Sequence, residues 1–359
     1  MKKFSLLLLA ALLAVSLIGC APDAPQQYRT EFLGTFDTVV SVIGYADTEE
    51  EFSQAAGIVH ETFAGLHQLF DIYHGYSGVN NIKTINDNAG LMPVKVDARI
   101  IELLQTAKEW HSKTDGAVNV AMGPVLAVWH EYRGTGIASP EDAAVPGAQE
   151  LAEAAKLTDI GKIAIDEAAS TVYIEAGMRI DVGAIAKGYA TQAAADALIA
   201  AGYDSVLISA GGNVAAVGAP KDGRDKWGVG VKDPQSDLAY STDDENLLDV
   251  AYVSGVSVVS SGSYERYYEV DGVRYHHLID PQTLFPAAHC IGVTVIAQDS
   301  TAADVLSTAA FVLPPEEAML LIENTEGTEA LWVHENGDVT LSSGMAAYLK
   351  HIGGATNGA

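Results

Sequence analysis

The 359-residue sequence has only two cysteines and far fewer basic than acidic residues. Cys20 and Cys290 cannot build an internal disulfide framework, so stability must come from packing, and Cys290 is expected to be a core thiol. Lysine and arginine together number 20 against 47 aspartates and glutamates, which gives a formal net charge of −27. Such a surface repels polyanions, and no basic patch is visible, so nucleic-acid binding is not expected.

Common nucleotide-binding motifs are also missing. No Gly-x-Gly-x-x-Gly follows a predicted strand, and the segment from Gly183 to Gly188 is not a Walker loop. Rossmann and P-loop folds are therefore excluded, and any nucleotide must bind to another scaffold. No internal repeat is visible.

The amino-terminal segment has the pattern of a bacterial lipoprotein signal peptide. Two lysines precede the apolar run Phe4 to Leu17, and a small residue precedes Cys20. The run is shorter than the roughly 20 residues of a spanning helix, although a transmembrane anchor is the alternative. We expect a signal peptide at 1–19, a lipidated Cys20 with a tether at 20–29, and export to the extracytoplasmic face of a bacterial cell membrane.

The remaining chain alternates between helical and strand periodicities, which indicates an α+β protein. The segment 139–147, rich in Pro, Ala and acidic residues, and the polar acidic segment 235–246 are expected on the surface. The segment from Thr114 to Pro124 is irregular but apolar enough to be buried. The predicted strands are Thr38 to Tyr45, Met178 to Val182 and Ser205 to Ser209, and the predicted helices are Glu49 to Phe70, Asp97 to Lys113 and Ala184 to Ala201, the last stopped by Gly202.

Two constellations suggest chemistry. Asp304 and Thr308 are four residues apart, so on a helix a carboxylate and a hydroxyl lie side by side and offer the oxygen ligands that Mg²⁺ prefers. The alternative is that Thr301 and Asp304 form a capping box. In the second, Asp181 ends a predicted strand and Lys187 falls in the first helical turns; ordinary helix initiation is the alternative there.

A third candidate is the segment from Ser260 to Pro286, which contains several tyrosines and adjacent histidines. Side chains alternate along a strand, so His276 and His277 must face opposite ways, and only one can enter a shared pocket. The alternative is an edge hairpin, closed by the turn at Val270-Asp271-Gly272, that has no chemical role.

Together these motifs resemble the FAD:protein FMN transferase (ApbE) family over about Thr30 to Met345. The resemblance is carried by Asp181-Val-Gly-Ala-Ile-Ala-Lys-Gly-Tyr, Gly211-Gly212-Asn213, Ser261-Gly-Ser-Tyr-Glu-Arg-Tyr, His277-Leu-Ile-Asp-Pro and Ala303-Asp-Val-Leu-Ser-Thr308. It implies a mixed or antiparallel β core with packed helices, arranged as two interleaved lobes with the flavin between them. The domain would span 30–345, followed by a flexible tail at 346–359.

The resemblance also implies an activity. The family uses Mg²⁺ and FAD, transfers FMN to a Thr or Ser hydroxyl of an acceptor protein in a Ser/Thr-Gly-Ala-Thr-like motif, and releases AMP. His277 would be the general base. The implied metal ligands are the Ala184 carbonyl, Asp304 and Thr308, and the implied flavin contacts are Leu33, Tyr73, Ala117, Val118, Asn119, Asp181, Lys187 and Leu278.

Several positions depart from the family pattern. Val118 and Asn119 stand where an aromatic residue and an aspartate are usual, and Leu284 stands where a glycine is usual. Leucine does not share the backbone freedom of glycine, so Leu284 is expected to reshape the turn after His277. Two further functions remain open: an FAD pyrophosphatase that uses water as the acceptor, and a flavin-binding lipoprotein without turnover.

Overall fold

A large antiparallel sheet organises the protein, and the computed structural model describes residues 24–236 and 246–358. The strands predicted from alternating side chains at 38–45 and 205–209 both belong to this sheet. In spatial order its strands are β1 (Gln26–Thr35), β2 (Thr38–Ala46), β6 (Ser205–Ala210), β7 (Asn213–Gly218), β10 (Ser257–Gly262), β13 (Gly292–Ala297), β14 (Glu329–Val333) and β15 (Val339–Leu341). The predicted α+β class is confirmed.

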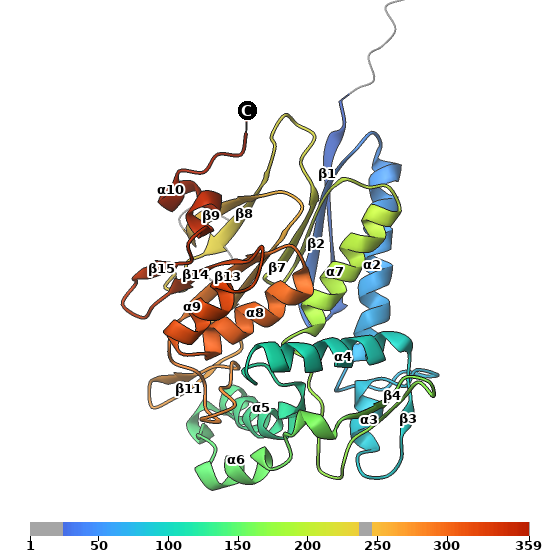
Figure 1. Ribbon diagram of the computed structural model, residues 1–359, viewed down its shortest axis with the longest axis vertical. Helices are drawn as coiled ribbons and strands as arrows, with labels where there is room; N and C mark the ends of the chain where they lie inside the picture. The colour runs from blue at the N-terminus through green and yellow to red at the C-terminus, as the bar shows by residue number, and fades with distance from the viewer. Residues whose placement is uncertain (1–23, 237–245, 359) are drawn as a thin grey trace, which may run out of the picture.

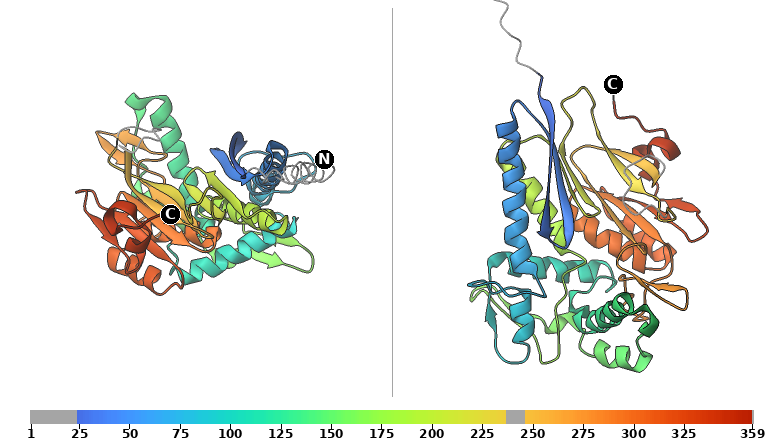
Figure 2. Two further views of the ribbon diagram at one scale, coloured as in Figure 1. Left: turned by 90° about the horizontal axis from the view of Figure 1, so that it is seen from above. Right: turned by 180° about the vertical axis from the view of Figure 1, so that it is seen from behind.

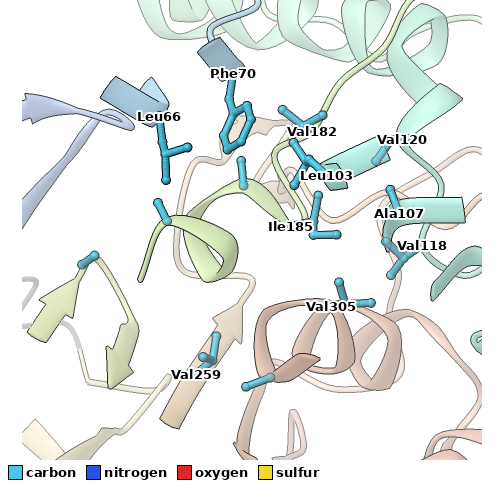
Figure 3. Packing of buried hydrophobic residues seen from close by; sticks show 14 of the residues in the cluster. Leu66, Phe70, Leu103, Ala107, Val118, Val120, Val182, Ile185, Val259 and Val305 are labelled. Atoms are coloured by element: carbon cyan, nitrogen blue, oxygen red, sulfur yellow. The ribbon is translucent and has the colours of Figure 1, made fainter. Parts of the chain in front are cut away.

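Helices cover one face of this sheet and enclose the main core (Figures 1 and 3). The helix α2 has the predicted bounds and begins where the Thr48 hydroxyl accepts from Glu51 N. The helix α7 is stopped by Gly202, whose φ of +90° suits only glycine well. The covering helices are α2 (Glu49–Phe70), α7 (Ala186–Ala200), α8 (Ser300–Val312) and, outside α8, α9 (Pro315–Glu323).

The opposite face is closed by a smaller layer with its own apolar cluster around Trp227. This layer consists of the paired strands β8 (Trp227–Lys232) and β9 (Leu247–Val253), the 3₁₀ turn η5 (Met345–Tyr348) and the short helix α10 (Lys350–Gly353). Leu349 is fully buried here, and Asp225 N donates to Asn357 O at 2.8 Å. The prediction of a flexible tail at 346–359 is therefore wrong up to Gly358, because these residues pack and hydrogen-bond.

A second group of elements lies beyond the lower end of α2 and α7, away from the C-terminus (Figures 1 and 2). Its longest members are α4 and α5, and a third apolar cluster joins α5 and α6 to the hairpin β11–β12. Its elements are α3 (Ile82–Asp87), α4 (Ala98–Lys113), η1 (Val120–Met122), α5 (Gly123–Ala138), η2 (Pro140–Asp142), α6 (Ala148–Ala155), η3 (Ile160–Lys162), β3 (Val94–Lys95), β4 (Ala164–Asp166), β5 (Thr171–Tyr173), β11 (Tyr268–Val270) and β12 (Val273–Tyr275).

Three features of the fold differ from the sequence predictions. The fold begins at Gln26, which pairs with Ala46, so the tether predicted for 20–29 is too long. The segment from Met178 to Val182 is not a strand: Ile180 N donates to the Asn86 side chain and Asp181 N to the Val120 carbonyl, and no strand lies beside it among the described residues. The helix α5 was not predicted at all.

Some predictions lie outside the described residues. The signal sequence and Cys20 fall in 1–23, and most of the acidic segment 235–246 falls in 237–245. Within the described part of the chain, no helix combines the length and the apolar character needed to cross a membrane.

Candidate functional site

A buried carboxylate lies where α7 crosses α8. Asp304 is only 3% exposed; its Oδ2 accepts from Gly188 N at 2.8 Å and its Oδ1 is 3.9 Å from Lys187 Nζ. The helices approach this closely because residue 188 has no side chain: a Cβ there would lie 2.5 Å from both Asp304 Cβ and Ser300 O. The fold thus brings the Asp304 carboxylate close to the Lys187 ammonium group, although the two residues are more than 100 positions apart in the sequence.

The start of α8 leaves Asp304 available for this role. The helix is capped by Asp299, whose Oδ1 accepts from Ala302 N at 2.7 Å. The alternative that Thr301 and Asp304 cap the helix is therefore wrong. Ser307, fully buried, donates to the Asp304 carbonyl at 2.9 Å and shares a hydrogen bond of 2.8 Å with Ser261 of β10, which fixes α8 against the sheet.

The oxygen atoms around Asp304 suit a hard divalent cation. Thr308 follows one helical turn later and is partly exposed, and Ala184 lies in the turn that leads into α7. Among the described residues, no group of three or more His, Cys, Asp or Glu side chains could hold a metal. A cation at Asp304 would therefore need hydroxyl and carbonyl oxygens as its other protein ligands, which Mg²⁺ accepts.

Asp181 shapes the turn that precedes α7. Its Oδ1 accepts from Gly183 N at 2.9 Å, while α7 itself begins only at Ala186 and has no side-chain cap. Asp181 therefore orders the loop rather than capping the helix. Lys187 falls in the first turn of α7, as expected, and its side chain is about one-quarter exposed (26%).

The two adjacent histidines follow β12 and have different surroundings, as the alternation of side chains predicted. His276 packs edge-on against Phe311 of α8; its Nε2 donates to Ala287 O at 3.0 Å and its Nδ1 accepts from Leu278 N at 3.2 Å. Burial lowers the pKa of His276 to about 4, so it is neutral in the core. This histidine is structural.

His277 lies on the other side of the segment, in a partly buried position. Its Nδ1 is 3.2 Å from the Glu265 carbonyl, which can only accept, so Nδ1 carries the proton and Nε2 keeps a free lone pair. Burial lowers the pKa of His277 strongly, and the positive charges of Arg266 and Lys187 lower it further. A neutral imidazole with a free Nε2 can accept a proton from a bound hydroxyl.

The turn after His277 keeps a backbone conformation that suits glycine, although leucine stands at position 284, so the expected reshaping of this turn is not seen at that residue. Leu284 has a φ of +66°, a region that L residues other than Asn and Asp rarely occupy. Trp129 of α5 holds it there by donating from Nε1 to the Leu284 carbonyl at 2.9 Å. The hairpin turn at Asp271 and Gly272, with φ of +51° and +78°, forms as predicted.

A buried carboxylate fixes the loop that carries Tyr73. Asp71 accepts from Tyr73 N at 2.6 Å, from His74 N at 3.0 Å and from the Tyr76 hydroxyl at 2.8 Å. Burial alone would raise the pKa of Asp71, but these donors hold it below its usual value. Tyr73 itself is 57% exposed and offers its ring to a ligand.

The other residues implied as flavin contacts have varied positions. Leu33 is exposed near the β1–β2 turn, whose Asp37 is 3.5 Å from Arg266. Val118 and Leu278 point into the main core, where Figure 3 labels Val118 near Val305. Ala117 is buried as well, and the Asn119 side chain is occupied by Ala121 N and the Thr158 carbonyl. In the described structure, only backbone atoms or rearranged side chains of 117–119 could reach a ligand.

Sequence reasoning missed two side chains of α5 that lie near this site. His130 Nδ1 is 3.5 Å from the Tyr73 hydroxyl, and Arg133 Nη1 donates to the Arg266 carbonyl at 3.5 Å. Pro124 at the first turn of α5 and the apolar pair at positions 125 and 129 were the available signals for this helix.

Two cavities are lined in part by the residues described above. The larger, about 530 Å³, is lined by Tyr73, Arg179 and residues of α3 and α5. The smaller is lined by His130, Arg133, His276 and His277 together with aromatic residues. Asp304 is not among the residues that line these two cavities, but the charge of its neighbour Lys187 reaches His277.

Comparison with known proteins places this architecture in a family. The model of the ApbE family matches residues 36–332. The chain is 35% identical to the FAD:protein FMN transferase of Treponema pallidum, over 81% of each chain, and 32% identical to that of Klebsiella pneumoniae, over 81% of this chain and 87% of the relative.

Solved structures agree. The ApbE protein of Thermotoga maritima superposes with a TM-score of 0.77 at 30% identity, covering 90% of this chain and 99% of that one. The flavin transferase ApbE of Vibrio cholerae, at 22% identity, shares the fold with a TM-score of 0.74 and covers 90% of this chain and 100% of its own.

Proposed function

This chain belongs to the ApbE family, and from that premise we propose that it transfers the FMN moiety of FAD to a Thr or Ser hydroxyl of an acceptor protein and releases AMP. The observation that carries the proposal is the buried Asp304, held beside Lys187, together with His277, whose Nε2 is free and whose pKa responds to the same lysine. A carboxylate that can bind a metal, a cation that screens phosphate charge and a neutral base can together support phosphoryl transfer from a diphosphate.

The proposed reaction is a displacement at the FMN phosphorus. The acceptor hydroxyl oxygen bonds to this phosphorus, His277 Nε2 takes the hydroxyl proton, and the bond from phosphorus to the bridging oxygen breaks, so that AMP leaves with that oxygen. The low pKa of free His277 favours the neutral form, and the negative charge of bound FAD would raise it toward the range of an effective base.

Lys187 would screen the charge of the diphosphate. We propose that Ala184 O, Asp304 and Thr308 hold Mg²⁺, which when bound would neutralise charge on the phosphate oxygens. In a protein with a net charge of −27, such a cation would offset the repulsion between the Asp304 carboxylate and the diphosphate. Gly188 N keeps the Asp304 carboxylate oriented toward this position.

The flavin contacts remain part of the proposal. Tyr73 offers an exposed ring for stacking, and Asp71 keeps its loop in place. Contacts from Leu33, Asp181, Leu278 and the backbone of 117–119 are proposed on the family pattern alone.

The proposal includes a location and a partner. The lysines, apolar run and Cys20 at the amino terminus support an exported protein held at a bacterial membrane by lipid. The acceptor would be a protein that carries a Ser/Thr-Gly-Ala-Thr-like motif. Labelling of whole cells with a radioactive fatty acid, compared between the full chain and Cys20→Ser, tests the anchor.

The transferase proposal is tested with the chain from Ala21 onward, FAD, Mg²⁺ and a purified acceptor domain that carries the motif. The intact mass of the acceptor and released AMP are recorded for the unmodified enzyme, His277→Ala and His289→Ala. His289 is an exposed histidine shortly after the segment that carries His277, so its replacement is a matched control. We expect one FMN added per acceptor, loss of addition without Mg²⁺, loss in His277→Ala and full activity in His289→Ala.

Other outcomes would identify the alternatives. AMP with free FMN and an unmodified acceptor, using an acceptor that a related transferase modifies, would indicate an FAD pyrophosphatase. FAD that stays bound with no product would indicate a binding protein. Equal activity of His277→Ala and His289→Ala would remove His277 from the role of base.

A further inference from the structure

Three arginines from separate segments lie near Tyr73 and His130, and one of them lines the same small cavity as His277, the proposed base. They are Arg133 of α5, Arg179 of the loop before Asp181, and Arg266 of the loop after β10. Arg133 Nη1 contacts the Arg266 carbonyl, and the charges of all three arginines act on both Tyr73 and His130. Burial lowers the pKa of Arg133, and the charge of Arg266 lowers it further. Like charges repel, so the proximity of these three arginines does not stabilise the folded protein.

These arginines have few carboxylate partners in a very acidic chain. Among the described residues, neither Arg133 nor Arg179 has a carboxylate oxygen within 4.0 Å, whereas ten other lysines and arginines do. Arg266 has one at 3.5 Å, from Asp37, whose side chain is 94% exposed. Asp181 is the acidic group whose charge reaches Tyr73 and His130 together with the arginines. The partly buried Asp181 and the exposed Asp37 carry two negative charges against the three positive charges of the arginines. The cluster therefore keeps a positive charge.

The position of the cluster indicates which substrate would use it. Arg133 lines the small cavity that also contains His277 and His130. Under the proposed function, His277 faces the acceptor hydroxyl, while the FAD diphosphate is held at Lys187 and Asp304. Because Arg133 and His277 line the same cavity, an acidic group close to the target hydroxyl of the acceptor would lie beside Arg133.

We propose that Arg133 and Arg266, with Arg179 adding to the positive potential, form a binding site for acidic side chains that flank the target hydroxyl of the acceptor protein. This inference rests on the proposed function. Guanidinium groups match carboxylates in bidentate geometry, and a local positive site allows an acidic partner to approach a surface that otherwise repels it. The site selects acceptors by charge and orients the hydroxyl toward His277.

The test is a double-mutant cycle between enzyme and acceptor. The acceptor domain is used unchanged and with the acidic residues within six positions of its target Thr replaced by amides; the enzyme is used unchanged and as Arg133→Gln. Arg133→Lys keeps the charge. Lys95→Gln is the matched control, because Lys95 is an exposed cation of β3 without an ion pair among the described residues. Melting temperatures verify that each variant folds.

We expect kcat/KM for the acceptor to fall about tenfold in Arg133→Gln and about tenfold with the neutralised acceptor, and to fall no further when both changes are combined. Arg133→Lys should retain at least a third of the activity, Lys95→Gln should match the unmodified enzyme, and KM for FAD should stay within twofold in all variants. High salt should weaken the preference for the acidic acceptor.

Multiplicative losses in the double variant, or no loss in Arg133→Gln, would overturn the inference. A rise in KM for FAD equal to the rise for the acceptor would assign the arginines to FAD instead. Failure of the unmodified enzyme to modify either acceptor would be a failure of the proposed function, and it is distinguishable because it requires no variant.

Discussion

The close crossing of α7 and α8 at Gly188 predicts that alanine at this position lowers the stability of the protein, whereas the same substitution at the open position Gly57 raises it slightly. Alanine at 188 would place its Cβ 2.5 Å from Asp304 Cβ, 2.5 Å from Ser300 O and 3.0 Å from Thr301 Cα. Real Cβ atoms do not approach heavy atoms this closely, and two of the three contacts are with backbone. The helices must therefore separate, which breaks packing between elements that contribute much of the main core.

The magnitude follows from two opposing contributions. Replacing a glycine inside a helix by alanine stabilises by roughly 0.5–1 kcal/mol through reduced backbone entropy of the unfolded chain. Overpacking costs about 1–3 kcal/mol or more. For Gly188→Ala the second contribution exceeds the first, so we expect a net loss on the order of 2 kcal/mol. In Gly57→Ala, within α2, no heavy atom lies within 4 Å of the new Cβ, so only the stabilising contribution remains.

Thermal unfolding of the two variants in parallel provides the measurement. A loss on the order of 2 kcal/mol corresponds to a melting temperature lower by about 3 °C in a domain of this size, and Gly57→Ala should melt at or slightly above the unmodified protein. Gly188→Ala should also lose activity, since its Cβ displaces the Asp304 carboxylate. A Gly188→Ala protein that melts and reacts like Gly57→Ala would refute the close crossing of the two helices.

Three further predictions concern single side chains. Asp304→Asn should reduce AMP release at least 100-fold and raise the Mg²⁺ concentration needed for half activity, with little change in melting temperature because the amide oxygen can still accept from Gly188 N; unchanged Mg²⁺ dependence would contradict it. Asp71→Asn should lower stability by about 1.5–3 kcal/mol and raise KM for FAD through Tyr73, measured by urea unfolding and steady-state kinetics. His276 has a folded pKa of about 4, below its unfolded value near 6.5, so the unfolded chain binds more protons and stability is lost as pH falls from 6.5 to 4. His276→Gln should flatten this slope by up to about 3 kcal/mol over that range in urea titrations; an unchanged slope would show that His276 does not contribute to it.

A helix could be predicted from the sequence where regularly spaced apolar residues follow a residue that can cap the helix. The bounds of α2 follow from its apolar spacing and from Thr48, and both are local. The false strand at Met178 to Val182 shows the limit of this signal. Met178, Ile180 and Val182 are buried in alternation, as the pattern indicated, but the backbone between them bonds to the Asn86 side chain and to Val120 O. Periodicity reports which side chains are buried and not which group accepts the backbone hydrogen bonds.

The site was predictable to a different degree. Local spacing singled out Asp304 and Lys187, the family pattern supplied their roles, and in the structure Asp304 does meet Lys187. The cap of α8 could have been assigned locally, because Asp299 precedes the helix directly. His130 and Arg133 could not, because their apolar and polar neighbours are spread around α5 and give no single face. Their role depends on contacts with Tyr73 and Arg266, which lie 57 and 133 positions away in the sequence.

The two adjacent histidines show how core packing can aim a reactive group. His276 has both ring nitrogens engaged, with Ala287 O and Leu278 N, and its ring lies against Phe311. These contacts fix the backbone at 276–278, and the alternation of side chains then leaves His277 only the opposite side, toward Glu265. Protonation of His276 would remove the acceptor for Leu278 N, so the buried histidine can hold this orientation only while it is neutral. The orientation of His277 should therefore be lost at acidic pH together with the packing of its neighbour.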